Sequence, residues 1–132
     1  MIEKGFKYLQ YFSYKELENH YTGKGFSIED SKKEIKKISE WYMMKMDLLR
    51  SLIGDPIHFN SLTDGTHVQN SYHYKGEAGD WRTTSKKTPN QILQHCIEAD
   101  FKRIGWYPEW NTPGFHTDTG NGTALWTRKN KV

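Results

Sequence analysis

Cysteine is nearly absent from this sequence, which has Cys96 alone among 132 residues. A single cysteine excludes an intramolecular disulfide and a thiolate zinc cage, so any metal site must use histidines and carboxylates. Long apolar runs are also missing: no stretch has the length of a membrane-spanning helix, and residues 1–7 contain no apolar run of the signal-peptide type. We therefore expect a protein made in the cytoplasm without a signal peptide, and no membrane partner.

The sequence also lacks a strong charge of one sign. The 19 basic and 16 acidic residues leave a formal net charge of +3. This mild excess suits a nucleic acid, an anionic cell-wall polymer or an ordinary solvated surface, and it does not choose among them. Hydrophobic residues at 35% and aromatic residues at 14% are typical of a folded chain. The length allows one substantial core, so residues 1–132 are expected to form a single domain.

Helix signals occur in three places. Ser13 with Glu16 predicts a short helix to about residue 20, and Ser27 with Asp30 predicts a longer one that continues to residue 53. A third helix is predicted to begin at Thr88-Pro89, with apolar residues at helical spacing up to position 104.

Short alternating runs between and after these helices predict strands over residues 57–60, 67–74, 77–83, 114–119 and 123–128. The last two runs flank Gly120-Asn121-Gly122, which is typical of a turn. The predicted fold class is α+β, with helices packed on a mainly antiparallel sheet.

One segment concentrates residues that bind metals. His73 and Asp80 are seven positions apart across a turn containing glycine, so neighbouring strands could bring them together. A catalytic zinc site needs three protein ligands and one position for water, and an imidazole and a carboxylate supply two of the three. His116, on a predicted strand with small neighbours, is the best candidate for the third, and His67 is the other histidine that fits an active site. The spacing alone does not specify a metal site.

The same segment resembles a known family. The zinc D-Ala-D-Ala carboxypeptidases carry the motif S-x-H-x-x-G-x-A-x-D, followed near the C-terminus by a histidine that is often part of H-x-D. Their zinc-site architecture is similar to that of endolysin L-Ala-D-Glu endopeptidases and the hedgehog signalling domain. The matching positions here are Ser71, His73, Gly76, Ala78 and Asp80, then His116 and Asp118.

This resemblance implies a hedgehog/DD-peptidase-like fold and a zinc ion held by His73, Asp80 and His116. Asp118 would orient His116 and Ser71 would support the ligand segment by hydrogen bonding. The zinc would polarise the scissile carbonyl and lower the pKa of its water, while a carboxylate passes the proton to the leaving amine.

The sequence departs from the family in two places. The family's general base usually precedes the last histidine by about three residues, where this chain has Pro113, so Glu109 and Asp118 are the nearest substitutes and Glu109 ranks first. The family's substrate-binding arginine is missing from residues 60–65, and Arg82 or Arg103 would replace it. Trp110 is the first choice for a further substrate contact.

The expected function is a zinc-dependent peptidase that hydrolyses a peptide bond in peptidoglycan stem peptides, as phage endolysins do. The alternative is a catalytically inactive, zinc-stabilised module that binds the cell wall. A nucleic-acid-binding domain is the third hypothesis, and no nucleic-acid partner is expected. Endopeptidase against carboxypeptidase specificity, the bond cleaved and the oligomeric state stay open.

Overall fold

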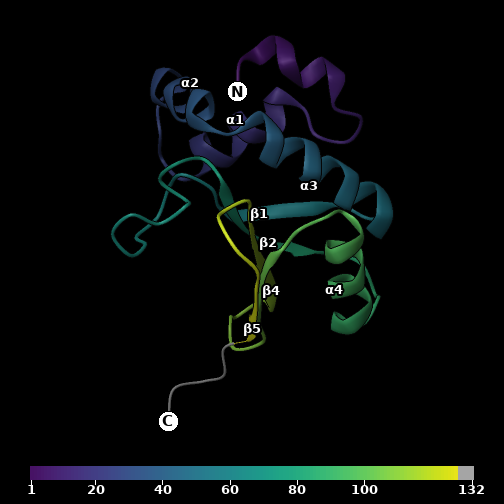
Figure 1. Cartoon of the computed structure of the whole chain (residues 1–132). Helices are drawn as coiled ribbons and strands as arrows, with labels where there is room; N and C mark the ends of the chain where they lie inside the picture. The colour runs from purple at the N-terminus through teal and green to yellow at the C-terminus, as the bar shows by residue number, and fades with distance from the viewer. Residues whose placement is uncertain (128–132) are drawn as a thin grey trace.

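The structure is a computed structural model that describes residues 1–127, and it has an α+β fold (Figure 1). Its elements are η1 (Glu3–Tyr8), α1 (Tyr14–Gly23), α2 (Ile28–Lys37), α3 (Glu40–Ile53), β1 (Ile57–Ser61), β2 (Ala78–Thr83), α4 (Pro89–Glu98), β3 (Arg103–Tyr107), β4 (Gly114–Asp118) and β5 (Ala124–Thr127). The five strands form one sheet in the order β1-β2-β4-β3-β5. Every pairing is antiparallel except that of β3 with β5. The mainly antiparallel sheet of the sequence analysis is therefore confirmed, although the sheet is mixed.

Hydroxyl caps begin the helices where the sequence predicts them. The side chain of Ser13 accepts a hydrogen bond from the backbone of Glu16, and Ser27 accepts one from Asp30. Thr88 and Gln91 form a reciprocal capping box at the start of α4. These bonds satisfy amide groups of the first helical turn that have no partner within the helix. Within residues 1–127, no helix combines the length and the apolar character needed to cross a membrane.

The prediction of one continuous helix from residue 27 to residue 53 was wrong. The chain leaves the helix at Ile38 and Ser39, and the Ser39 side chain then caps α3 by accepting from the backbone of Tyr42. The backbone N–H of Ser39 donates to the carbonyl of Gly76 at 2.8 Å, so a distant turn takes the amide that a continuous helix would have used. The apolar spacing continues across the break and hides it in the sequence.

The prediction of a strand over residues 67–74 was also wrong. Residues 71–77 form consecutive turns, in which the carbonyl of His73 accepts from the backbone of Gly76 at 3.0 Å. Gly76 has a φ of 72°, and a β-carbon there would lie 1.9 Å from the carbonyl oxygen of Lys37. Only glycine allows this turn to approach the junction between α2 and α3 so closely.

Two expectations for the C-terminal part of the sheet were wrong. The apolar spacing predicted a helix up to residue 104, but α4 ends at Glu98. Ile104 belongs to β3, although its position continues the helical spacing of the residues before it. Strands β4 and β5 do not form a hairpin, because β3 lies between them. Arg128, the last residue of the predicted final strand, lies outside the described residues.

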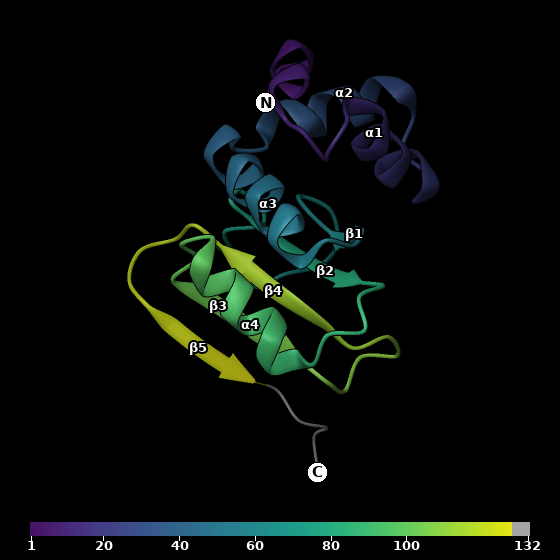
Figure 2. The same cartoon turned by 90° about the vertical axis from the view of Figure 1, so that its right-hand side faces the viewer.

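The core lies between the helices and one face of the sheet. On that face Trp81 and Phe115 are buried, and the indole of Trp81 donates to the hydroxyl of Thr117 at 3.0 Å. Thr117 also contacts Tyr42 and Met46 of α3 through hydrogen bonds of 3.2 and 3.3 Å. Buried Cys96 of α4 belongs to the same cluster. Figure 2 shows α4 beside β3 and β4, while α1 and α2 lie at the opposite end of the molecule from β5.

Candidate metal centre

His73 lies in the turns between β1 and β2, and it is only 2% exposed. The hydroxyl of Ser71 accepts from its backbone N–H at 3.2 Å, which is the supporting bond expected from the sequence. The imidazole Nδ1 lies 2.7 Å from the carbonyl oxygen of Leu62. Because a carbonyl only accepts, Nδ1 carries a hydrogen, and in the neutral imidazole the lone pair is on Nε2. Nε2 in turn lies 3.3 Å from Oδ1 of Asp80.

Asp80 and His116 are direct partners in neighbouring antiparallel strands. Asp80 of β2 is paired with His116 of β4, which places their side chains on the same face of the sheet. Nδ1 of His116 lies 2.8 Å from the same Asp80 oxygen that faces His73. The rings of His73 and His116 are 5.2 Å apart and inclined at 63°. The three residues named by the motif therefore meet around one carboxylate oxygen.

The same row of the sheet continues to Trp126. Gly105 of β3 is paired with both His116 and Trp126, and a β-carbon on Gly105 would lie 2.6 Å from the indole. The glycine lets Trp126 approach the sheet, and the indole lies 5.4 Å from the His116 ring. Its Nε1 donates to the hydroxyl of Tyr107 at 2.8 Å. The Trp126 indole, held by Tyr107, thus lies beside the candidate centre.

His116 is held between two carboxylates. Its Nε2 lies 2.7 Å from Oδ2 of Asp118, opposite the contact with Asp80. Burial disfavours the charged imidazole, but the hydrogen bonds with Asp118 and Asp80 outweigh it and raise the pKa of His116 to about 8. Burial also disfavours the carboxylate of Asp80, yet bonds from His116 and His73 hold its pKa well below the usual range.

Asp118 is fully engaged. It is 2% exposed, and its Oδ1 accepts from Nε of Arg103 at 2.8 Å and from the backbone of Gly120 at 2.9 Å. Burial opposes ionisation of Asp118, but these bonds and the one from His116 lower its pKa. The guanidinium of Arg103 also lies over the rings of Tyr72 and Trp126, at 5.3 and 5.8 Å. Asp118 and Arg103 are therefore both engaged in contacts within the protein.

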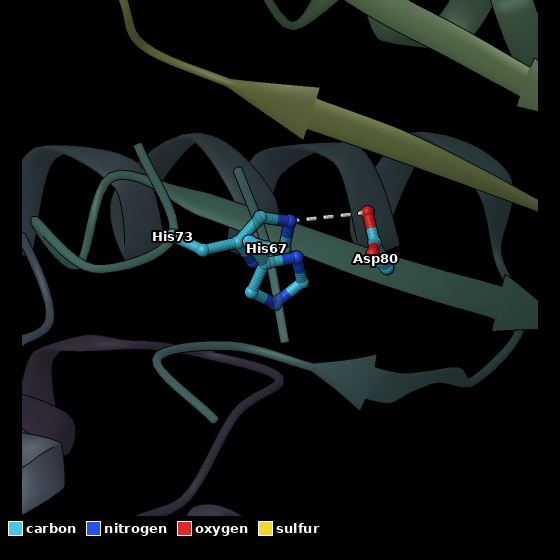
Figure 3. A group of neighbouring side chains, drawn as sticks. All are labelled: His67, His73 and Asp80. Carbon is cyan, nitrogen blue, oxygen red and sulfur yellow. Dashed lines mark ion pairs between the residues drawn. The ribbon is translucent and has the colours of Figure 1, made fainter. Parts of the chain in front are cut away.

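His67 lies beside the centre as well. Its ring stacks on that of His73 with the centroids 3.7 Å apart and the planes 3° from parallel, and Figure 3 shows the two rings facing Asp80. Burial lowers the pKa of His67. Each of His67, His73 and Asp80 offers a ligand atom within 4.8 Å of the others, so this group could hold a metal ion.

Three of the residues proposed for catalysis and substrate binding are not hydrogen-bonded or ion-paired with the centre within residues 1–127: Glu109, Arg82 and Trp110. Glu109 is half-buried in the loop between β3 and β4, and its Oε2 has no hydrogen-bond partner among the described residues. No hydrogen bond or ion pair found within residues 1–127 joins Glu109 to His73, Asp80 or His116. Arg82 and Trp110 line one cavity of about 330 Å³, together with Asn60, Asn111 and Thr112.

Comparison of the chain with protein-family models, with curated proteins and with solved structures finds no match. The geometry of the centre and the motif that forms it are therefore the basis for assigning a function.

Proposed function

We propose that this chain is a zinc-dependent peptidase that hydrolyses a peptide bond in bacterial peptidoglycan stem peptides, with a hedgehog/DD-peptidase-like fold. One observation carries the proposal: His73 and His116 both lie against the same carboxylate oxygen of Asp80. Asp80 and His116 are 36 residues apart in the chain. The residues that meet are those that the carboxypeptidase motif assigns to the metal.

The spacing between the ligand atoms of His73 and Asp80 suits zinc. Tetrahedral zinc with bonds of about 2.0–2.2 Å holds its ligands roughly 3.3–3.6 Å apart. Nε2 of His73 and Oδ1 of Asp80 are 3.3 Å apart, and a cation between them would relieve the approach of a lone pair to a carboxylate. The shorter 2.8 Å contact of Asp80 with His116 is occupied by a proton, which a metal ion would displace.

His116 is a better third ligand than His67. A metal ion lies in the plane of the imidazole that binds it, where the nitrogen lone pair is directed. Because the rings of His67 and His73 are stacked and parallel, an ion in the plane of one lies well outside the plane of the other. The ring of His116 is inclined to that of His73, so the planes of these two rings intersect.

Bound zinc would polarise the scissile carbonyl and acidify a water at its fourth position. Asp118 fixes the His116 ring by accepting from Nε2, which leaves Nδ1 to bind the metal. Since both oxygens of Asp118 are already engaged, we assign proton transfer to Glu109, whose carboxylate has an oxygen without a partner.

The cavity lined by Arg82 and Trp110 suits a substrate carboxylate. Arg82 is two residues after Asp80 on β2, so the two side chains share a face about 6–7 Å apart along the strand. The guanidinium donates to the side chain of Asn60, and within residues 1–127 it has no carboxylate partner. Arg103, the other candidate, is neutralised by Asp118. The free charge of Arg82 therefore favours it as the residue that binds substrate.

A wall-hydrolysis assay tests the proposal. Purified protein with one zinc should release amines from peptidoglycan, and a chelator or His73→Ala should abolish the release. Glu109→Gln should retain zinc and lose activity by roughly 10²- to 10⁴-fold. Stoichiometric zinc without any release from peptidoglycan would favour a zinc-stabilised module that binds the wall instead. Absence of zinc binding would contradict both.

A further inference from the structure

Asp64 lies three residues beyond the end of β1, in the buried segment Ser61–Asp64, and is itself only 5% exposed. Its carboxylate Oδ1 accepts from the backbone N–H of Leu62 at 2.8 Å and contacts Nε2 of His20 at 2.9 Å. Its Oδ2 lies 2.9 Å from the ammonium of Lys24. His20 and Lys24 belong to the C-terminal end of α1, so one carboxylate ties this segment to a helix.

The carbonyls of the same segment hold two histidines of the candidate centre. The carbonyl of Leu62 accepts from Nδ1 of His73 at 2.7 Å. The carbonyl of Asp64 and the hydroxyl of Ser61 each lie 2.8 Å from Nε2 of His67. A carbonyl only accepts, so Nδ1 of His73 carries a hydrogen and the neutral ring keeps its lone pair on Nε2. The Asp64 carbonyl likewise favours a hydrogen on Nε2 of His67, beside the Ser61 hydroxyl of the same segment. The two residues that supply these carbonyls are the two whose positions the Asp64 carboxylate fixes.

We propose that Asp64 is a positioning residue, which anchors the segment Ser61–Asp64 to α1 and thereby sets the ring orientation and tautomer of His73 and His67. The Asp64 carboxylate touches none of His73, Asp80 and His116; it acts through the two backbone carbonyls. A histidine that binds a metal depends on such a partner at its other nitrogen to keep the lone pair directed at the ion. The consequence for zinc rests on the proposed function, whereas the tautomers are a property of the metal-free protein.

Asp64→Asn preserves the shape of the side chain and removes its charge. In the metal-free protein, nitrogen-15 NMR of the imidazoles should show wild-type His73 with its hydrogen on Nδ1 and the variant as a mixture of tautomers. Zinc affinity, measured by competition with a chromophoric chelator, should fall by roughly 10- to 100-fold. Wild-type tautomers and wild-type zinc affinity in the variant would overturn the inference.

Asp47→Asn is the matched control. Asp47 accepts from the backbone N–H groups of Gln10, Tyr11 and Phe12 at 2.9, 2.8 and 3.2 Å, so it is also an aspartate that anchors a backbone segment. Its loss should lower thermal stability without changing the tautomers or the zinc affinity. If Asp47→Asn lost as much zinc affinity, general destabilisation would explain the effect of Asp64→Asn, and the assignment of Asp64 as a positioning residue would be overturned.

Lys24→Met provides a second variant if Asp64→Asn does not fold. The Lys24 side chain is 42% exposed, and its ammonium binds both Asp64 and the carbonyl of Asn60, so its removal loosens the anchor and leaves the core intact. Zinc affinity should fall by roughly two- to fivefold, in line with a partly exposed ion pair. An unchanged His73 tautomer together with unchanged affinity would count against the inference. A wild-type protein that binds no zinc would defeat the proposed function and leave the tautomer result standing.

Discussion

The imidazole of His116 lies between the carboxylates of Asp80 and Asp118, with a nitrogen within 2.8 Å of each. Two acceptors around one ring favour the doubly protonated form, which explains its pKa of about 8 despite burial. The charged ring stabilises the metal-free fold fully below the ordinary histidine pKa of about 6.5, and this contribution is lost as pH rises through 8.

Zinc binding should follow the opposite trend with pH. The metal requires the neutral ring, so the proton on Nδ1 of His116 must leave. Zinc affinity should therefore rise about tenfold per pH unit up to pH 8 and then level off. Competition titrations with a chromophoric chelator between pH 6 and 9 measure this dependence. A flat affinity between pH 6 and 8 would mean that His116 does not exchange its proton for the metal.

Single residues of the centre were largely predictable, and their partners were not. The resemblance to the carboxypeptidase motif named His73, Asp80 and His116, and the structure brings these three side chains together. Asp64 gave no sequence signal beyond a turn at Asp64-Gly65, since its role depends on a helix 40 residues earlier in the chain. The sequence also suggested Arg103 as a substrate contact. The pairing of β3 with β4 places it beside Asp118, which binds its guanidinium.

At the scale of elements, the turn before β2 depends on Gly76. Gly76→Ala would force a positive φ on alanine and place its β-carbon against the backbone of Lys37. We expect a loss of about 3 kcal/mol or more in the free energy of unfolding, together with loss of zinc binding. Gly25→Ala is the control, because Gly25 also has a positive φ, of 96°, but open space around it. Urea denaturation should show a loss of only about 1 kcal/mol there, and equal losses at both positions would refute the steric explanation.

Ser39 is the second element-scale test, because it separates α2 from α3. Ser39→Ala removes the side-chain oxygen that accepts from the backbone of Tyr42 at 3.2 Å. The free energy of unfolding, measured by urea denaturation, should fall by about 0.5–2 kcal/mol. Greater stability in Ser39→Ala would instead indicate that residues 27–53 prefer one continuous helix and that the break is not needed.

Elements were predictable where the deciding signal is local. The caps at Ser13, Ser27 and Thr88 mark real helix starts, because the bond that decides them spans three residues. The break at Ser39, the turns before β2 and the insertion of β3 between β4 and β5 depend on contacts between distant segments. The apolar pattern of a short segment carries no information about contacts with distant segments. Ile104, for example, fits the pattern of a helix as well as that of a strand.

At the scale of the whole molecule, helices pack on one face of the sheet and the candidate centre is built on the other. Trp81 and Phe115 alternate along β2 and β4 with Asp80 and His116, so the same strands carry the core and two residues of the candidate centre. The turns before β2 then add His73 from the side. This division between a packed face and a polar face gives buried, rigid support to the side chains of the candidate centre.

Zinc content in two histidine variants is the decisive test of which residues bind the metal. After dialysis against metal-free buffer, the wild type and His67→Gln should each retain about one zinc per chain by elemental analysis. His116→Gln, with folding verified by circular dichroism, should retain almost none, because three protein ligands are needed for a stable open site. Retention of zinc by His116→Gln and its loss from His67→Gln would contradict the assignment of His73, Asp80 and His116 as the ligands.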